Sequence, residues 1–212
     1  MMRRSKISPV SILSFMVIFL SGCAHTASIK DSADVYGKPL AVNAPRIGIA
    51  DFTDSRQNAK HIGQVAALAI NEPQTPINAI LTNRIASKLM EQGFNVQKIE
   101  ATTIKDEAEM GNLAVSSGSK ILISGDLNDF FIKSFDAMME SAKGQSRFSI
   151  KAFNASGQSV FEKSYIGSAE HFIGLTGQFG SDKAVEKTID ASVEQVFGDS
   201  EFQSILQKLK NE

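Results

Sequence analysis

The sequence predicts an α+β fold in which a mixed, mainly antiparallel sheet carries helices packed on one face. Three observations support this prediction: early strands alternate with helical segments, three strands follow one another as a meander, and two helices close the chain. Strands that gather in one region and helices that cover them form two packed layers. The predicted order is β-β-α-β-α-β-β-β-α-α, in one domain over residues 46–212.

The composition limits the class of protein. The chain has 212 residues, a formal net charge of −1 and no tryptophan. A length of this order fits one domain with a short extension. A nearly neutral chain gives no electrostatic reason to bind nucleic acid.

Basic residues and a short apolar run open the chain. Arg3, Arg4 and Lys6 precede an apolar run over residues 10–19, which leads to the sequence LSGC at residues 20–23. A membrane-spanning helix needs roughly 20 apolar residues, whereas the apolar part of a cleaved signal needs roughly 7–15. We therefore expect residues 1–22 to be a signal peptide.

Residues 20–23 resemble the lipobox of bacterial lipoproteins. The resemblance implies that Cys23 becomes an N-palmitoyl, S-diacylglycerol cysteine after cleavage in front of it. The alternative is a plain secretory signal followed by a chance cysteine. Cys23 is the only cysteine, so the chain cannot form an internal disulfide, and an unmodified thiol is a liability in an exported protein.

The residue after the cysteine and the segment that follows predict where the domain lies. The start of the chain resembles that of Gram-negative lipoproteins, in which an aspartate after the cysteine signals retention at the inner membrane. By that rule, Ala24 implies the outer membrane and its periplasmic side. Two or more acyl chains hold a protein stably on a bilayer. Residues 23–45 are small, polar and aperiodic, and we expect them to form the lipidated end and a flexible tether.

The first half of the domain is expected to begin with strands over residues 46–52 and 61–70. Thr75 is then expected to cap a helix with Pro76 at its first position, and Gly93 to stop it. The apolar face of this helix comprises Ile77, Ile80, Leu81, Ile85 and Leu89.

The next segments are a strand over residues 94–99 and a helix over residues 104–117. The apolar residues of this helix are Ala108, Leu113 and Val115, and Gly111 weakens it.

The meander begins with a long strand over residues 121–135. Its apolar phase shifts by one residue, which predicts a β-bulge near Asp129. A strand over residues 145–153, a hairpin turn at 154–157 and a returning strand over 158–167 complete the meander.

The chain is expected to end with two helices. Ser181 would cap the longer one, Gly198 would end it, and Ser200 with Gln203 would form a capping box for the shorter one. The apolar stripe of the longer helix comprises Val185, Ile189, Val193 and Val196.

The short terminal helix has an apolar stripe that allows two interpretations. The stripe packs on the body of the domain, or it contacts a partner or a lipid surface with help from Lys208 and Lys210. Its residues are Phe202, Ile205, Leu206 and Leu209.

Few residues suggest chemistry. His25, His61 and His171 are far apart in the chain and fall in no metal-binding pattern, so we expect no metal and no cofactor other than the covalent lipid. Glycines at 174, 177 and 180 before a helix could hold an anion, but the lysine and the spacing of a phosphate-binding loop are missing.

Two carboxylate pairs leave a hydrolase open. Asp51 with Asp54, and Asp126 with Asp129, lie at predicted strand ends. Two carboxylates in one cleft can act as general acid and base. Aspartates also end strands by bonding to nearby backbone, and we favour that interpretation.

Several segments together resemble the YajG-type lipoproteins of proteobacteria. The resemblance rests on residues 20–23, 51–56, 89–96, 147–165 and 184–210. It implies a lipoprotein with a small α/β domain and carries over no catalytic residue.

Three functions follow in order of preference. The first is a non-enzymatic outer-membrane lipoprotein that binds a protein partner or an envelope lipid as an accessory factor. The second is a structural subunit of an envelope assembly such as a secretion or surface-appendage complex. The third is a periplasmic hydrolase that uses the aspartate pairs.

Overall fold

The computed structural model describes residues 24–29, 36, 43–65, 68–100, 107–133, 141–172 and 178–211. It confirms the α+β class, with one nine-stranded mixed sheet. The elements are β1 (His25–Thr26), β2 (Arg46–Ala50), β3 (Thr53–Asp54), β4 (His61–Val65), β5 (Leu68–Asn71), α2 (Ile77–Glu91), β6 (Asn95–Ile99), α3 (Glu107–Ser117), β7 (Ile121–Lys133), β8 (Ser141–Asn154), β9 (Ser159–Phe172), α4 (Gln178–Phe197) and α5 (Ser200–Asn211).

Strand β7 is the centre of the sheet. One of its edges pairs antiparallel with β8, which in turn pairs antiparallel with β9. Its other edge pairs in parallel with β2, then β3, then β4, through Ile121, Asp126 and Ile132 respectively. The chain from β2 to β4 therefore runs beside β7 as one interrupted strand.

The predicted bulge is confirmed. The register between β7 and β8 shifts between Leu127 and Asp129. This extra residue keeps both Leu127 and Phe130 buried, although they are three positions apart. The one-residue shift in the apolar pattern of the sequence therefore reflects a β-bulge in the backbone.

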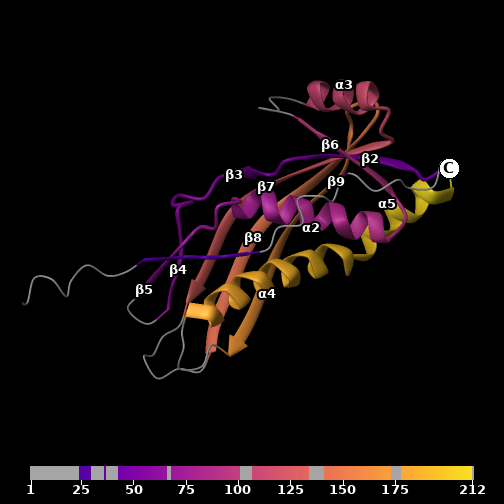
Figure 1. Ribbon diagram of the computed structural model, residues 1–212. Coiled ribbons are helices and arrows are strands. Elements are labelled where there is room, and N and C mark those ends of the chain that lie inside the picture. Colours follow the sequence, from indigo (N-terminus) through magenta and orange to yellow (C-terminus); the bar gives the residue numbers. More distant parts are fainter. Residues whose placement is uncertain are drawn as a thin grey trace, which may run out of the picture.

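Helices cover both faces of the sheet unequally (Figure 1). As predicted, α2, α4 and α5 contribute to one large core with Ile121 and Ile123 of β7. Helix α3 belongs to a smaller cluster with Leu122 and Phe153. Successive side chains of a strand point to opposite faces, so α3 lies on the face opposite the other three helices. The prediction that the helices pack on one face therefore holds for α2, α4 and α5 and not for α3.

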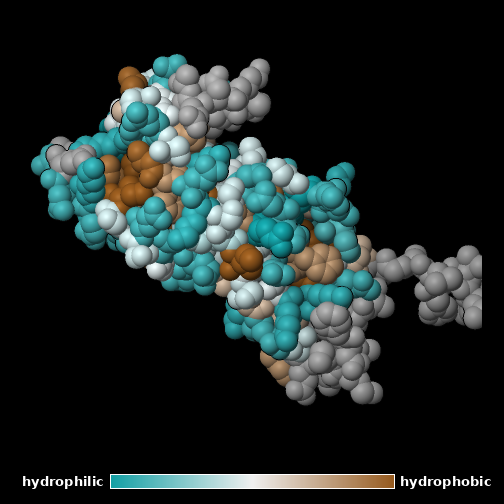
Figure 2. All heavy atoms as spheres, turned by 180° about the vertical axis from the view of Figure 1, so that it is seen from behind, coloured by the Kyte–Doolittle hydropathy of each residue, from teal (hydrophilic) through white to brown (hydrophobic). Residues whose placement is uncertain are grey.

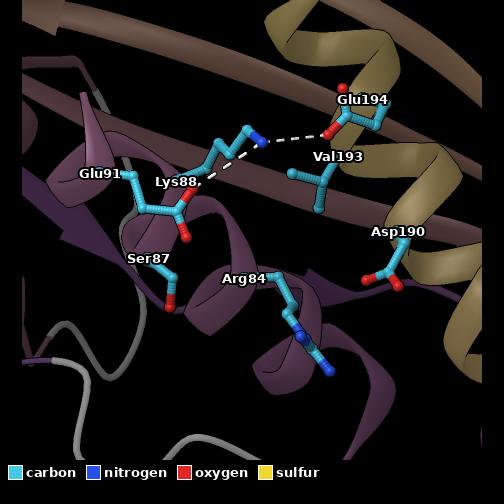
Figure 3. A pocket seen from close by; sticks show the side chains of 7 residues that line it. All are labelled: Arg84, Ser87, Lys88, Glu91, Asp190, Val193 and Glu194. Carbon is cyan, nitrogen blue, oxygen red and sulfur yellow. Dashed lines mark ion pairs between the residues drawn. The ribbon is translucent and has the colours of Figure 1, made fainter.

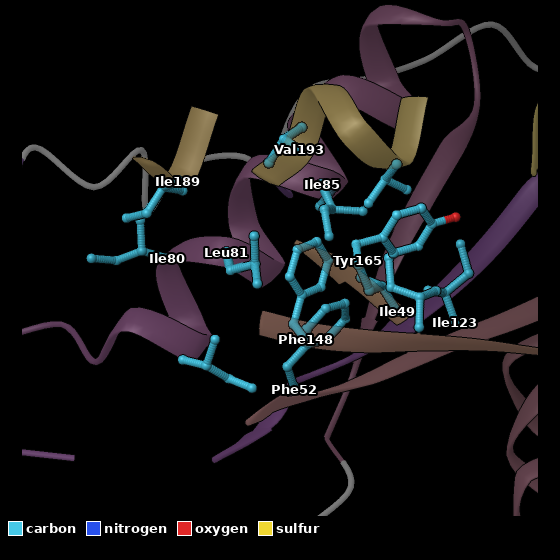
Figure 4. Close-up of a cluster of buried hydrophobic side chains, with 14 of the residues drawn as sticks. Ile49, Phe52, Ile80, Leu81, Ile85, Ile123, Phe148, Tyr165, Ile189 and Val193 are labelled. Atoms are coloured by element: carbon cyan, nitrogen blue, oxygen red, sulfur yellow. The ribbon is translucent and has the colours of Figure 1, made fainter. Parts of the chain in front are cut away.

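The large core lies between α2, α4 and the sheet (Figure 4). Phe148 of β8 stacks on Tyr165 of β9, with ring centroids 5.6 Å apart. Phe52, at the end of β2, is also fully buried, and its backbone amide donates to the Thr82 hydroxyl of α2. Apolar packing joins the first half of the chain to the meander, and the hydrogen bond attaches the segment after β2 to α2.

The second predicted strand is two strands. Instead of one strand over residues 61–70, β4 and β5 form an antiparallel hairpin with Val65 opposite Leu68. The apolar run from His61 onward carries no turn residue that signals the reversal. Continuous hydrophobicity cannot distinguish one long strand from two short ones.

The start of α2 differs from the prediction. Pro76 itself occupies the N-cap position, with an extended ψ of 147°, and no side chain on the cap residue makes a cap bond. Thr75 is therefore not the cap. The Glu72 carboxylate takes that role, because it accepts the amide of Ile77 at 3.0 Å.

The end of α2 follows the prediction. Gly93 has a φ of 90°. Its amide donates to Met90, and the amide of Phe94 donates to Leu89. This is the left-handed glycine stop expected from the sequence.

Helix α3 presents a different face from the predicted one. Met110 and Ala114 are buried, whereas Val115 is 64% exposed. Gly111 explains the difference, since a Cβ there would lie 2.7 Å from the backbone nitrogen of Gly157 in the β8–β9 turn. The glycine allows helix and turn to touch, and so decides which face points inward.

The caps of the last two helices also differ. Ser181 is buried inside α4, which already includes Gln178. Asp199 caps α5, because its Oδ1 accepts the amides of Glu201 and Phe202. The predicted capping box from Ser200 was therefore one residue late, while Gly198 ends α4 as expected.

The predicted tether begins differently from the expectation. Immediately after Ala24, β1 pairs in parallel with β5, and Ala27 is buried in the large core. Tyr36 also donates its hydroxyl to Asn83 of α2. The predicted signal peptide over residues 1–22, Cys23 and the predicted end of the long strand beyond Lys133 lie outside the described residues.

Among the helices that the structure describes, none combines the length and apolarity required to cross a bilayer.

Candidate functional site

Among the strands that the structure describes, β9 forms a free edge of the sheet. Within the described strands, it pairs only with β8, over its whole length of 14 residues. In an antiparallel pair, every second residue directs its amide and carbonyl away from the neighbouring strand. This edge therefore offers a row of backbone donors and acceptors to another extended chain.

A groove of about 670 Å³ runs along the middle of this edge. One wall is β9 from Lys163 to Ile166, and the other is formed by the end of α4 and the link between α4 and α5. The groove is lined by Lys163, Ser164, Tyr165, Ile166, Glu194, Gln195, Gly198 and Asp199. Most of these side chains are polar, which suits a peptide better than a lipid chain.

Tyr165 of β9 places a buried polar group beside this groove. The residue is 6% exposed, and its hydroxyl is buried close to the carboxylate of Asp199. Burial raises the pKa of this hydroxyl well above its usual value, and the charge of Asp199 adds to the effect. The hydroxyl of Tyr165 therefore stays neutral.

Lys163 and Asp199 hold the two walls together. Lys163 Nζ lies 2.5 Å from Asp199 Oδ2. Burial acts to raise the pKa of Asp199, but the hydrogen bond from Lys163 and the amides of α5 hold it below its usual value. The carboxylate is thus ionised, and it fixes the start of α5 beside β9.

A second groove lies between α2 and α4 (Figure 3). Lys88 is paired with Glu194 at 3.2 Å and with Glu91 at 3.8 Å, and Arg84 pairs with Glu186 at 3.6 Å. The basic side chains in this groove are therefore already paired with acidic ones. The groove is small, about 250 Å³, and we assign it no ligand.

The four candidate aspartates do not converge. Asp51 is exposed and pairs with Lys98, and Asp129 is exposed opposite Arg147. Asp126 lies opposite Thr53, whose hydroxyl donates to it at 2.7 Å. Asp54, the next residue after Thr53, must point to the other face.

Asp54 belongs to a buried charged cluster instead. Arg56 donates to it from Nε at 2.8 Å and from Nη2 at 2.6 Å, and Nη2 also lies 2.5 Å from Glu72. Only 3% of the Arg56 side chain is exposed. Because Glu72 also caps α2, the cluster fixes the loop after β3 to the start of that helix.

His61 and His171 lie in different parts of the structure and form no common site. His61 packs edge-on against Phe131, with centroids 6.2 Å apart. His171 lies near the end of β9, where burial and nearby Lys187 and Lys183 lower its pKa. The described part of the chain contains no group of three His, Cys, Asp or Glu side chains that could hold a metal ion.

The apolar stripe of α5 is part of the core. Phe202, Leu206 and Leu209 are at most 8% exposed, and Ile205 is partly buried against the same cluster. The suggested contact of this stripe with a partner or a lipid is therefore replaced by packing on the body. Lys210 extends over the ring of Phe94, 4.9 Å from its centroid.

Three predicted sites stay predictions: the lipidated Cys23, the glycine loop and Ala24. Cys23 and the glycines at 174 and 177 lie outside the described residues, and Ala24 is described only as an exposed residue before β1. The lipid on Cys23 and the sorting role of Ala24 remain predictions.

Sequence reasoning missed the edge of β9. The only signal was indirect: after residues 158–167 return from the hairpin, the chain continues as helices and supplies no further strand. A strand from earlier in the chain could also pair with that edge. Such long-range pairing cannot be predicted from the hydrophobic periodicity of the sequence.

Comparison with known proteins gives distant structural similarities alone. Neither a protein-family model nor a curated protein sequence matches this chain. Protein XCC0632 from Xanthomonas campestris is 8% identical, with a TM-score of 0.45, over 88% of this chain and 95% of that one. Lipoprotein GNA1162 from Neisseria meningitidis is 9% identical, with a TM-score of 0.41, over 73% and 99%.

A third similar structure is the PelC dodecamer from Paraburkholderia phytofirmans. It is 12% identical, with a TM-score of 0.36, over 72% of this chain and 92% of that one. Identities and TM-scores this low support no functional assignment. None of these three is of the YajG type, so that resemblance stays a prediction.

Proposed function

We propose that this protein is a lipoprotein of the bacterial envelope, anchored through Cys23 to the periplasmic side of the outer membrane, and that it acts by binding a protein partner rather than by catalysis. The signal-like start, the lipobox over residues 20–23 and Ala24 support the location. The aspartates considered for hydrolysis lie on different surfaces with their own partners, which removes the argument for a hydrolase.

The free edge of β9 is the observation that carries the binding role. A partner would add an extended segment beside this strand and gain main-chain hydrogen bonds, as in strand addition to other sheets. Its side chains would enter the groove between β9 and the α4–α5 link, where most of the lining side chains are polar. Backbone pairing would supply affinity, and the groove would supply specificity.

Lipid carriage is the less supported form of this accessory role. A carrier needs an apolar lining, because a lipid chain gains its free energy by leaving water. The groove beside β9 and the one between α2 and α4 are lined mainly by polar and charged side chains.

The same edge also supports a second candidate, a structural subunit of an envelope assembly. In that case the added strand would come from another copy of this chain. The two candidates differ in the mass of the partner that lies beside β9.

Photocrosslinking in the native host tests the proposal. A photoreactive residue at Ser164 or Ile166, both exposed on β9, should give a specific protein adduct. The same residue at Val115, which is 64% exposed on α3, should not. An adduct with the mass of two copies would favour the structural subunit.

The anchor is checked separately by intact-mass analysis of protein extracted from membranes. If the lipidated protein accumulates normally and both β9 positions give no more adduct than Val115, the binding proposal is wrong.

A further inference from the structure

A short strand joins the sheet directly behind the predicted lipid anchor. The two residues of β1 pair with Ile70 and Asn71 of β5, and the amide of Ala27 donates to the carbonyl of Asn71 at 3.2 Å. Figure 1 shows this indigo segment beside β5. Only Ala24 separates β1 from Cys23, and two Cα–Cα steps span at most about 8 Å. While β1 is paired, the anchor therefore stays close to the sheet.

The segment after Cys23 buries little apolar surface. β1 has two residues. Ala27 is 3% exposed in the large core and Ile29 packs partly against it, whereas Thr26 and Ser28 are exposed. A buried alanine contributes far less hydrophobic free energy than a larger apolar side chain. A region with so little buried surface separates more readily than the core of a domain.

Tyr36 is the next described residue of the amino-terminal segment. Its hydroxyl donates to Asn83 of α2 at 3.1 Å, and Lys98 lies 5.9 Å from the centroid of its ring. This residue lies thirteen positions after Cys23. Thirteen extended residues span at most about 45 Å, which limits the reach of the chain between the two points.

The back of the molecule has no single apolar surface (Figure 2). Apolar atoms on this face form separate patches that are divided by polar side chains. On this side, the distance between the domain and a bilayer therefore depends on the chain that joins the domain to its anchor.

We propose that residues 24–29 form a releasable clasp, which holds the domain against its anchor while β1 is paired and lets it stand away when β1 separates. With the clasp open and Tyr36 still bound to Asn83, the sheet can move up to about 45 Å from the anchor. The effect on reach rests on the proposed anchoring through Cys23, whereas the clasp can be tested without lipid.

The clasp changes the height of the partner edge and leaves the edge itself intact. β1 reaches the central strand β7 through β5 and β4, whereas β9 reaches it through β8. Release of β1 therefore breaks no pairing of β9. A partner that adds a strand to β9 can be met close to the membrane or further from it.

Thiol labelling measures the release in the mature chain with Cys23→Ser, which has no native thiol. Ala27→Cys is shielded while the clasp is closed. Ala152→Cys, at a fully buried position of β8, should react only on global unfolding, and Ser28→Cys is exposed throughout. Residue 27 should react at least about tenfold faster than residue 152 and at least about tenfold more slowly than residue 28.

Hydrogen exchange gives the same comparison without a substitution in the clasp. The amide of Ala27 should exchange faster than the amides of β7. Thr26→Cys with Asn71→Cys supplies a lock, because these register partners lie in neighbouring strands, about 4.8 Å apart. The disulfide should slow exchange at residue 27 and leave β7 unchanged.

The lipidated protein tests the reach. Lys60 is exposed, and its carbonyl accepts the amide of Glu72 directly after β5. A dye at Lys60→Cys should be quenched by spin-labelled headgroups in vesicles. Ala27→Asp places a charge in the core and opens the clasp, so it should reduce this quenching at least about twofold. Ser28→Asp, at an exposed position, should not.

Three results would overturn the proposal. Equal labelling of residues 27 and 152 would mean that β1 separates only when the domain unfolds, and equal labelling of residues 27 and 28 would mean that β1 is not paired. Equal quenching in Ala27→Asp and Ser28→Asp would remove the effect on reach. Intact mass reports on the anchor and photocrosslinking on the partner, so a failure of the clasp is distinguishable from both.

Discussion

Lys163 of β9 and Asp199 before α5 form an ion pair with an Nζ–Oδ2 distance of 2.5 Å, and the same carboxylate caps α5. One side chain therefore connects the free edge of the sheet to the final helix. The effects of the cap and of the ion pair can be separated by mutation.

Replacement of Asp199 by alanine should lower the free energy of unfolding by about 1 kcal/mol, the usual cost of a lost cap. Asp199→Asn keeps an oxygen that accepts the helix amides and should cost less. Lys163→Met removes the exposed ion pair alone and should have the smallest effect. Urea denaturation of the three variants checks this order, and an equal loss for asparagine and alanine would show that the cap is not the main contribution.

Arg56 should be the most sensitive charged residue of the domain. Arg56→Met leaves Asp54 and Glu72 together in a largely buried position without their cation. Breaking a buried ion pair on one side costs about 3 kcal/mol or more. The matched control is Arg84→Met, whose partner Glu186 lies 3.6 Å away at a more exposed position. Equal midpoints of urea denaturation for the two variants would contradict this prediction.

The same cluster should make stability depend on pH in the acid range. Burial acts to raise the pKa of Asp54, but the hydrogen bonds and charge of Arg56 prevail and hold it below its usual value, which is about 3.9 in unfolded chains. Because the folded-state pKa is the lower one, the stabilisation is complete above about pH 5 and is lost as the pH falls through the folded value.

Urea midpoints at pH 7, 5 and 3 measure this effect. Stability should change little from pH 7 to 5 and fall from pH 5 to 3. Asp54→Asn should reduce the fall without abolishing it, because the pKa of Asp199 is lowered as well. A fall of unchanged size in Asp54→Asn would assign the acid sensitivity to other groups.

Local signals in the sequence predicted much of the fold. Gly93 stops α2, and the phase shift near Asp129 marks the bulge, because each depends on a few neighbouring residues. The predicted N-caps of α2 and α5 were wrong, because a carboxylate at another position accepts the helix amides. That carboxylate is Glu72 for α2 and Asp199 for α5.

Long-range features were not predictable in this way. The two residues of β1 contain no strand pattern, and they pair with Ile70 and Asn71, some 45 positions later. The face that α3 presents depends on Gly111 meeting Gly157. The edge of β9 is free because no other described strand pairs with it, and this pairing cannot be read from the sequence of β9 itself.

The contact between α4 and the meander is a further long-range feature, and it gives a sharp steric prediction. A Cβ at Gly144 of β8 would lie 1.8 Å from Thr188 Oγ1 of α4. Gly144→Ala should therefore lower the free energy of unfolding by about 1–3 kcal/mol through overpacking. The neighbouring Gln145→Ala, on the exposed side of the strand, should change it by about 0.5 kcal/mol or less.

A second substitution tests the cause. Thr188→Ala removes the obstructing hydroxyl, and the Thr188 Cβ lies 3.0 Å from the added methyl position. The double variant Gly144→Ala with Thr188→Ala should thus be more stable than the sum of the two single losses. Strict additivity in urea denaturation would mean that the Thr188 hydroxyl is not the cause of the loss, and would assign it to the contact with Ile132 Cδ1, 2.6 Å from the added methyl position.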